Sequence, residues 1–280
     1  MTKQRDTQDT LRTLGVTPDK AFGQNFVQVP SVIDDIIRFG KPQEGEVIVE
    51  IGPGLGALTK ELATFGPMHA VEIEHAFARY IREHVRGVTV HEDDIRGFDL
   101  SEIGSDLVIF GNIPYSFSSE ILFYLLDNAL RNGTRMVKRA VLLVQKEFAE
   151  RVASGPGPKI YGIPSVRTAI LANTRLGPVF PGDIFYPVAS VESQVLELRF
   201  LAEPRFTIAD DLHFKHLLAV CFGTRRRKIF NSLSSSGQYN ETVLSAALND
   251  LAIDPDSRVE AISPEQFVGL SNRLFASSSA

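Results

Sequence analysis

A short apolar segment that runs into a glycine-rich turn restricts the fold of this chain more than any other part of the sequence. Residues 47–51 (Val-Ile-Val-Glu-Ile) form a β-branched run typical of a buried strand, and Gly52-Pro53-Gly54-Leu55-Gly56 interrupts it. Residues 57–65 then carry leucine and phenylalanine at helical spacing. The segment therefore predicts a strand, a tight turn and a helix in succession.

The same order of strand and helix recurs in the sequence that follows. Further strands are predicted at residues 69–73, 88–91, 107–110 and 141–145. Helices are predicted between them at residues 75–85 and 119–130. Strands that alternate with helices predict a doubly wound, mostly parallel α/β sheet covered on both faces. Residues 191–201 alternate in polarity and indicate a later strand, which can be antiparallel.

After Glu203-Pro204 the pattern contains helices only. One apolar stripe runs from Phe214 to Phe222 and another from Ile229 to Leu233. Continuing the first stripe would place Arg226 on an apolar face, so we expect a break near Gly223-Thr224. The sequence thus predicts a larger α/β domain of residues 1–202 and a smaller all-α domain of residues 203–280.

Composition narrows the class of protein. With 44% hydrophobic and 22% charged residues, the 280-residue chain resembles an ordinary globular protein. No apolar run approaches the ~18 residues of a membrane span, and residues 1–9 lack the apolar core of a signal peptide. The single cysteine, Cys221, excludes an internal disulfide and a cysteine-rich metal site. We therefore expect a cytoplasmic protein with no membrane partner and no metal.

The net charge and the local distribution of charge give opposite indications about a nucleic-acid partner. The net charge of −5 argues mildly against a nucleic-acid partner. However, Arg225-Arg226-Arg227-Lys228 holds four of the eight cations in residues 201–280, against nine acids there. With a helix break at Gly223, this basic run falls at a helix start. It is either a solvated face or a contact for phosphate groups.

Four polar features fall at the predicted carboxyl ends of strands, where open α/β sheets bind ligands. Gly52 and Gly54 permit close approach of the backbone, and Glu72 stands 20 residues beyond Gly52, the position of a ribose acceptor. Asp94 could accept from an adenine amine, and Asn112 completes the row. The spacing G-x-G-x-G differs from the dinucleotide pattern, so it indicates an adenosine-containing cofactor of open identity. Neighbouring acids are expected to be solvated or to cap helices: Glu50, Glu74 and Asp93.

The residues Asn112-Ile113-Pro114-Tyr115 end the predicted strand at 107–110. Because proline cannot donate a backbone hydrogen bond, the segment cannot continue as a central strand. An amide, backbone carbonyls and an aromatic ring then lie within one turn, a set that can accept hydrogen bonds from an exocyclic amine and stack on a flat ring. An ordinary strand-to-loop turn is the alternative.

Several motifs in order resemble the ribosomal RNA adenine-N6,N6-dimethyltransferase family, whose members use S-adenosylmethionine. The resemblance covers nearly the whole chain. Its motifs are Lys20–Phe26, Glu50–Gly56, Asn112–Tyr115, Gln145–Glu147, Tyr161-Gly162, Phe185–Pro187 with Val191–Ser193, and Arg225–Lys228 with Asn231–Leu233.

The resemblance implies roles for individual residues. Cofactor contacts would fall on Asn25, Val27, Gly52, Glu72, Asp94 and Asn112, with Gly54 in the same turn. The Asn112 side-chain oxygen and the Pro114 carbonyl would accept the hydrogens of the target amine, while Tyr115 and Phe185 would hold the two faces of the base. The N-terminal segment with Asn25 and Val27 would fold over the cofactor, and the basic run Arg225, Arg226, Arg227 and Lys228 would contact RNA.

The resemblance also implies a target, the small-subunit (16S) rRNA of an immature 30S particle. The oligomeric state is left open by the sequence, and we expect a monomer. Ile113 departs from the family, which more often has leucine there, whereas large-subunit (23S) rRNA adenine methyltransferases often have isoleucine. The helical C-terminal region with its basic run favours the small-subunit branch. A large-subunit target and a mainly non-catalytic assembly checkpoint remain as alternatives.

Overall fold

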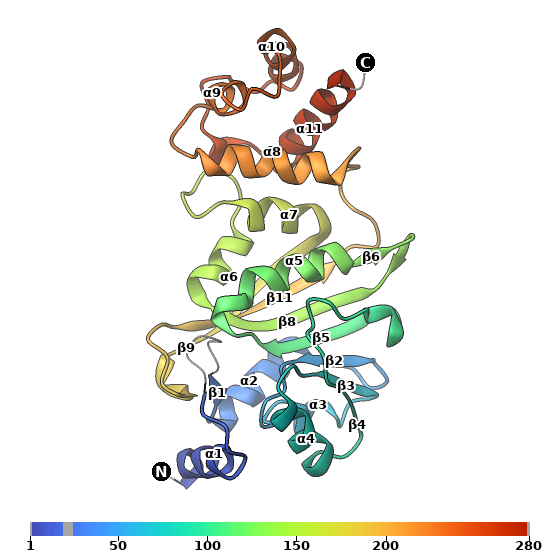
Figure 1. Ribbon diagram of the computed structural model, residues 1–280, viewed down its shortest axis with the longest axis vertical. Coiled ribbons are helices and arrows are strands. Elements are labelled where there is room, and N and C mark those ends of the chain that lie inside the picture. The colour runs from blue at the N-terminus through green and yellow to red at the C-terminus, as the bar shows by residue number, and fades with distance from the viewer. Residues whose placement is uncertain (1, 19–24, 279–280) are drawn as a thin grey trace. The chain divides into compact units, whose positions relative to one another are not determined.

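The chain divides into two compact units, and each unit is built from two separate stretches of the sequence (Figure 1). The computed structural model describes residues 2–18 and 25–278. The first unit comprises Met1–Glu150 and Ala172–Glu203, and the second comprises Arg151–Leu171 and Pro204–Ala280. The predicted boundary near residue 203 therefore has a counterpart in the structure. Residues 151–171, however, cluster with the C-terminal helices, because Tyr161, Val166 and Ile170 pack in the helical core.

A seven-stranded sheet organises the first unit, in the order β4-β3-β2-β5-β8-β11-β9. The strands from β4 to β8 are parallel, and β11 is antiparallel to both of its neighbours. Their bounds are β2 Ile48–Ile51, β3 Met68–Val71, β4 Val88–His91, β5 Leu107–Asn112, β8 Val137–Gln145, β9 Ala172–Phe180 and β11 Ser193–Phe200. The predicted mostly parallel sheet is confirmed. The edge strand β9 was not predicted, because it contains Gly177-Pro178 and most of its side chains are not buried.

Helices pack against the edge strands of this sheet and against an interior strand. α2 (Pro30–Gly40) packs on β9, α4 (His75–His84) on β4 and α5 (Ser118–Asn128) on β8. The helix predicted at residues 57–65 is only one turn long, α3 (Thr59–Leu62), within a series of turns. The shorter elements of the unit are α1 Thr2–Thr13, β1 Phe26–Val27, η1 Leu100–Glu102, η2 Tyr115–Phe117, β6 Leu130–Arg131, β7 Thr134–Arg135, η3 Gly182–Ile184 and β10 Phe185–Tyr186. α6 (Lys146–Ala153) contains the point at which the first unit ends.

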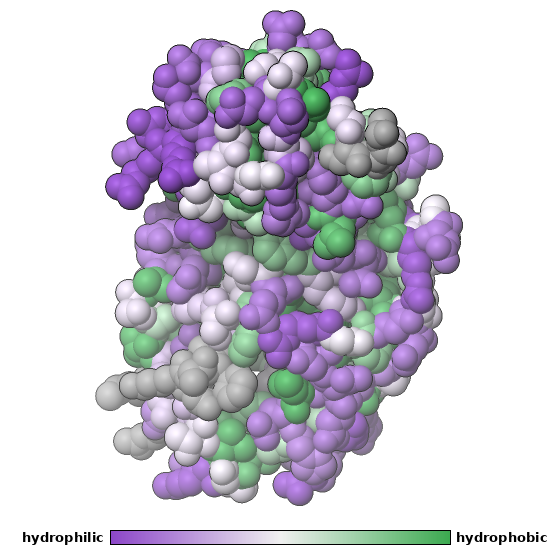
Figure 2. Space-filling model, turned by 45° about the horizontal axis from the view of Figure 1, so that its top comes forward, coloured by the Kyte–Doolittle hydropathy of each residue, from purple (hydrophilic) through white to green (hydrophobic). Residues whose placement is uncertain are grey.

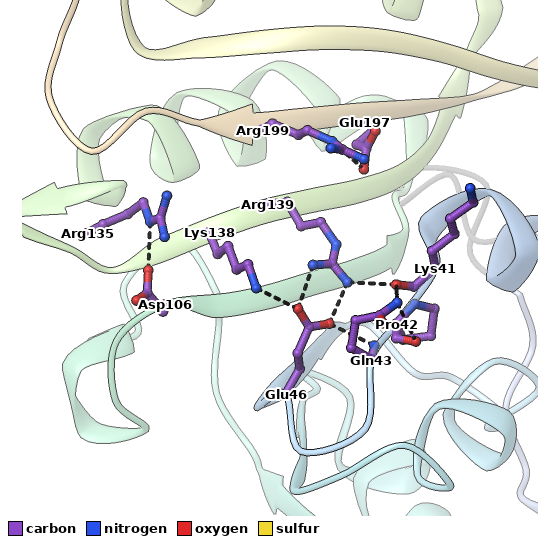
Figure 3. Close-up of polar contacts among 10 residues, drawn as sticks. All are labelled: Lys41, Pro42, Gln43, Glu46, Asp106, Arg135, Lys138, Arg139, Glu197 and Arg199. Carbon is purple, nitrogen blue, oxygen red and sulfur yellow. Dashed lines mark hydrogen bonds and ion pairs between the residues drawn. The ribbon is translucent and has the colours of Figure 1, made fainter.

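A partly buried ion cluster joins β8 to the segment before β2 (Figure 3). The Glu46 carboxylate accepts from Arg139 Nη1 at 2.7 Å and Nη2 at 2.5 Å, and from Lys138 Nζ at 2.9 Å. Arg139 Nη2 also donates to the carbonyl of Lys41 at 3.2 Å. Although burial alone would raise it, the hydrogen bonds from Arg139 and Lys138 lower the pKa of Glu46 to about 2. The cluster holds the amino ends of the strands together, at the sheet edge opposite Asn112.

The second unit is a helical bundle with its own core. Its elements are α7 Ile163–Leu171, α8 Asp211–Gly223, α9 Ile229–Ser234, α10 Glu241–Asp250, η4 Val259–Ala261 and α11 Pro264–Ser278. Phe214, Leu217 and Leu218 of α8 are buried at its centre. Burial raises the pKa of the Cys221 thiol to about 12, so Cys221 is a structural residue of this core.

Most apolar side chains lie in the two cores. Figure 2 shows a face on which hydrophilic side chains predominate and apolar ones form separate patches. Among residues 2–18 and 25–278, no helix is both long and apolar enough to cross a bilayer. The same residues contain no group of three or more His, Cys, Asp or Glu side chains arranged to hold a metal ion.

Candidate active site

A cavity of about 450 Å³ opens at the carboxyl ends of the strands, entirely within the first unit. It is where the topology of an open α/β sheet places a ligand. The sequence-predicted site residues that line it are Asn25, Val27, Gly52, Gly54, Glu72, Asp94, Asn112, Pro114 and Tyr115. The sheet thus brings together residues that are far apart in the chain.

The glycine turn after β2 forms one wall of the cavity. Gly52 and Gly54 have φ values of +65° and +54°, a left-handed conformation that favours glycine. The Gly54 N–H donates to Glu72 Oε2 at 3.1 Å, and the Glu74 N–H donates to Glu72 Oε1 at 2.9 Å. Burial raises the pKa of Glu72, although these two hydrogen bonds act in the opposite direction. Glu72 therefore fixes the turn and still offers carboxylate lone pairs to the cavity.

Glu50 is a site residue that sequence reasoning assigned to solvent or to a cap. The structure corrects this, because Glu50 lies inside the buried strand β2, lines the cavity and is only 2% exposed. Its Oε2 has no hydrogen-bond partner among the described residues. Burial raises the pKa of Glu50 to about 8, opposed by the Thr59 hydroxyl and reinforced by Glu72. An acid within a strand that is otherwise apolar was the signal that could have identified it.

Asp94 lines the cavity as predicted, but its carboxylate already has a partner. Arg96 Nε lies 3.0 Å from each Asp94 oxygen, and Arg96 Nη2 lies 2.6 Å from Oδ2. These hydrogen bonds lower the pKa of Asp94, so the group is an anion at neutral pH. Arg96 also lines the cavity and was not predicted as a site residue. Its position two residues after Asp94 was the available signal.

Asn112 ends β5 with its amide group oriented by a hydrogen bond. Its Nδ2 donates to the backbone carbonyl of Asn25 at 2.6 Å, which leaves the side-chain oxygen as the acceptor for a ligand. β1 pairs with β10, and this pairing holds Val27 at the cavity. Residues 25–27 thus line the cavity, whereas residues 20–24 of the motif lie outside the described residues.

Two backbone carbonyls follow Asn112, and they differ in their partners. The Pro114 carbonyl, the predicted second acceptor, already accepts from the Phe117 N–H at 3.0 Å and from Ser118 Oγ at 3.4 Å. The Ile113 carbonyl accepts no hydrogen bond from any described residue, and Ile113 also lines the cavity. Of the two carbonyls, that of Ile113 therefore keeps more of its accepting capacity.

Tyr115 and Phe185 have different environments. The Tyr115 hydroxyl lies 2.7 Å from Ser193 Oγ, which orients a half-buried ring at the cavity. Phe185, in contrast, is 0% exposed and packs in the core of the first unit. Phe185 pairs with Val27 between β10 and β1 and is not part of the cavity lining. The structure thus does not bring Phe185 and Tyr115 together on one cavity, as the resemblance implied it would.

The four cations of the basic run have unequal environments in the second unit. The predicted break is confirmed, since α8 ends at Gly223 and α9 begins at Ile229. Arg225 Nη2 donates to the carbonyls of Lys159 and Tyr161, and Lys228 pairs with Asp256 at 2.8 Å. Arg226 and Arg227 are exposed, and neither pairs with a carboxylate among the described residues. These two side chains are the part of the run available to a ligand.

Comparison with known proteins covers almost the whole chain. Residues 17–275 match the model of the family described as ribosomal RNA adenine dimethylase. The protein named ribosomal RNA small subunit methyltransferase A of Syntrophus aciditrophicus is 35% identical over 94% of this chain and 96% of its own. The protein of that name from Aeromonas hydrophila is 37% identical over 93% and 95%, respectively.

Solved structures agree on the fold. The 23S rRNA methyltransferase ErmE matches with a TM-score of 0.66 and 25% identity, over 90% of this chain and all of that one. A dimethyladenosine transferase from Plasmodium falciparum matches with a TM-score of 0.71 and 22% identity, over 88% and 95%. Both similarities extend well beyond the glycine turn and the Asn112 segment.

Proposed function

Because this chain belongs to the ribosomal RNA adenine dimethylase family, we propose that it dimethylates N6 of adenine in small-subunit rRNA with S-adenosylmethionine as methyl donor. The observation that carries the proposal is the location of Asn112-Ile113-Pro114-Tyr115 on the same cavity as Gly52, Glu72 and Asp94. One cavity thus offers acceptors for an adenosine cofactor and for a target amine. The proposed substrate form is the immature 30S particle, the proposed enzyme is a monomer, and the proposed compartment is the cytoplasm.

The residues of the cavity fit S-adenosylmethionine. This cofactor carries ribose hydroxyls, an adenine amine and an ammonium group, all of which donate hydrogen bonds. Glu72 and Asp94 offer carboxylates at the ends of adjacent strands, and the unpartnered Glu50 Oε2 offers a further buried acceptor. A Cβ at Gly52 would meet no atom within 4 Å, so the backbone there faces open space into which a ligand fits. When bound, the cofactor supplies an electrophilic methyl group on its sulfonium.

The residues after β5 then prepare the target. The adenine amine is a poor nucleophile because its lone pair is delocalised into the ring. In the first of the two transfers, the Asn112 side-chain oxygen and the Ile113 carbonyl each accept one amine hydrogen, which favours a tetrahedral nitrogen with a localised lone pair. Tyr115, held by Ser193, stacks on the base. Neutral Asn112 suffices because catalysis here is mostly positioning.

A large-subunit target is the second candidate, supported by Ile113 and by the similarity to ErmE. To decide between the two, purified small and large ribosomal subunits lacking the modification are incubated separately with the protein and labelled S-adenosylmethionine. We expect label in small-subunit rRNA, recovered as N6,N6-dimethyladenosine by mass spectrometry. Label confined to the large subunit would contradict the proposed target but leave adenine methylation intact.

The family resemblance also suggests an assembly checkpoint, in which binding of the immature small subunit matters more than methylation. A catalytically inactive variant separates the two roles. If Asn112→Ala still binds small subunits and still alters their maturation, binding contributes independently. If that variant loses every effect on maturation, methylation alone accounts for the function.

Arg226 and Arg227 are predicted to carry the RNA contact of the basic run. Replacing both with alanine should weaken small-subunit RNA binding and lower the slope of log affinity against log salt by about 1.5, since about 0.7–0.9 is lost per phosphate contact. Binding measured between low and moderate salt checks both values. Arg273→Ala, which removes an exposed cation paired with Asp250 in the same unit, should leave the slope unchanged. An unchanged slope in the double variant would mean that the run is only a solvated face.

A further inference from the structure

One guanidinium group spans two segments that the proposed reaction uses separately. Arg96 holds Asp94, which follows β4, through Nε and Nη2. With Nη1 it donates to the carboxylate of Glu120, in the first turn of α5. Its guanidinium carbon also lies 4.6 Å from the centre of the Phe117 ring in η2. The contacts of Arg96 therefore cross from the cofactor side of the cavity to the segment that carries Tyr115.

The partners on the two sides have different tasks. Under the proposed function, Asp94 accepts a hydrogen bond from the adenine amine of the cofactor. Phe117 closes η2, because its N–H donates to the Pro114 carbonyl at 3.0 Å, and Glu120 lies in the first turn of the helix that follows. Asp94, Arg96, Phe117 and Tyr115 all line the same cavity. A restraint on the Asp94 carboxylate is thus transmitted through a single side chain to the turn that presents Tyr115.

The arrangement depends on the shape of arginine. A planar guanidinium with five donors can hold one carboxylate through two nitrogens, reach a second carboxylate and lie over a ring at the same time. A lysine ammonium is a compact charge, so it could pair with Asp94 but could not also lie over Phe117 and hold Glu120. Replacing Arg96 with lysine should therefore keep the ion pair with Asp94 but remove the contacts with Phe117 and Glu120.

We propose that Arg96 is a positioning residue that couples cofactor binding at Asp94 to the ordering of the target-base turn, residues 113–121. Fixing Asp94 against the cofactor fixes Arg96, and fixing Arg96 restrains Phe117 and Glu120. The base-binding turn is then most ordered when the cofactor is in place. This inference rests on the proposed function for the identity of the turn's ligand, whereas the contacts themselves lie within the first unit.

The experiment measures binding and local order without RNA. S-adenosylhomocysteine is titrated by calorimetry onto the full chain and onto Arg96→Ala and Arg96→Lys. Hydrogen exchange of the peptide spanning residues 113–121 is then followed with and without saturating S-adenosylhomocysteine. In the unaltered protein we expect the ligand to slow exchange there by at least about fivefold, the lower end of typical coupling between sites.

The two variants should separate the effect of the ion pair with Asp94 from the effect of the contacts with Phe117 and Glu120. Arg96→Ala should bind the ligand about tenfold more weakly, since Asp94 loses a charge-assisted partner, and should lose the slowed exchange. Arg96→Lys should bind within about threefold of the unaltered protein, because its ammonium keeps the pair, yet lose the slowed exchange as well. A merely structural role would not separate these two readouts.

Arg82→Ala is the matched control, because Arg82 pairs with Glu92 beside the end of β4 and is not part of the cavity lining. It should retain both the affinity and the slowed exchange. Three outcomes would overturn the proposal: slowed exchange that persists in Arg96→Ala, tighter binding by Arg96→Ala, or loss of the slowed exchange in Arg82→Ala. Normal binding and exchange without methylation of small-subunit rRNA would instead count against the proposed function.

Discussion

Replacing Asn112 with alanine is expected to reduce kcat for adenine methylation by about a hundredfold to a thousandfold, the scale of removing one oriented polar group from a reaction centre. The substitution removes the acceptor for the target amine and the donor to the Asn25 carbonyl. Because Glu72, Asp94 and the glycine turn remain, affinity for S-adenosylhomocysteine should fall much less than kcat does. Single-turnover methylation and ligand titration measure the two effects separately.

Asn128→Ala provides a matched control for this prediction. The Asn128 amide donates to the Tyr124 carbonyl at the end of α5, and Asn128 is not part of the cavity lining. Its replacement should leave kcat unchanged. A normal methylation rate for Asn112→Ala would show that the Asn112 side chain does not position the target amine and that backbone groups do.

Replacing Arg139 with alanine is expected to destabilise the first unit by about 3 kcal/mol, the lower end of the cost of breaking a buried ion pair. The Glu46 side chain is only 11% exposed, and Lys138 would be its one remaining cationic partner among the described residues. Urea unfolding at neutral pH measures the loss. Arg131→Ala, which removes an exposed partner of Asp99, should produce no comparable change. Equal stability of the two variants would show that the Glu46 cluster contributes little.

The same cluster predicts how stability depends on pH. Glu46 has a pKa of about 2 in the folded chain, below its ordinary value of 4.5. A folded-state pKa below the unfolded one stabilises the fold above the unfolded value, and that stabilisation is lost as pH falls toward the folded value. Unfolding free energy should therefore decline between about pH 4.5 and pH 2, and less steeply in Arg139→Ala. A decline of the same steepness in both proteins would assign the acid sensitivity to other carboxylates.

Much of the fold could be predicted because its signals are local. Apolar β-branched runs identified β2 to β5, and helical spacing identified α4 and α5. Residues 151–171 were misplaced because the choice between two cores depends on partners far along the chain. The apolar side chains of α7 fit either environment by sequence alone, and only packing against α8 and α11 decides between them.

The site was predicted where topology alone determines position. Glu72, Asp94 and Asn112 each lie at or just after the carboxyl end of a parallel strand, and parallel strands bring these ends to one edge of the sheet. Burial and pairing are properties of three-dimensional surroundings, so they could not be read from spacing. This is why Glu50 was assigned to solvent, Phe185 to the site and the Pro114 carbonyl to the target amine, and why Arg96 was missed.

Because the chain passes between its two units more than once, its order of synthesis has a consequence for folding. α7 leaves the ribosome before the helices that bury it, while β9 and β11, made next, return to the sheet of the first unit. The apolar side chains of Tyr161, Val166 and Ile170 therefore remain exposed to solvent until the C-terminal helices emerge. A chain that stops at residue 203 would complete its sheet but keep this apolar face uncovered. Such a nascent or truncated chain is prone to aggregate and is a natural client of chaperones.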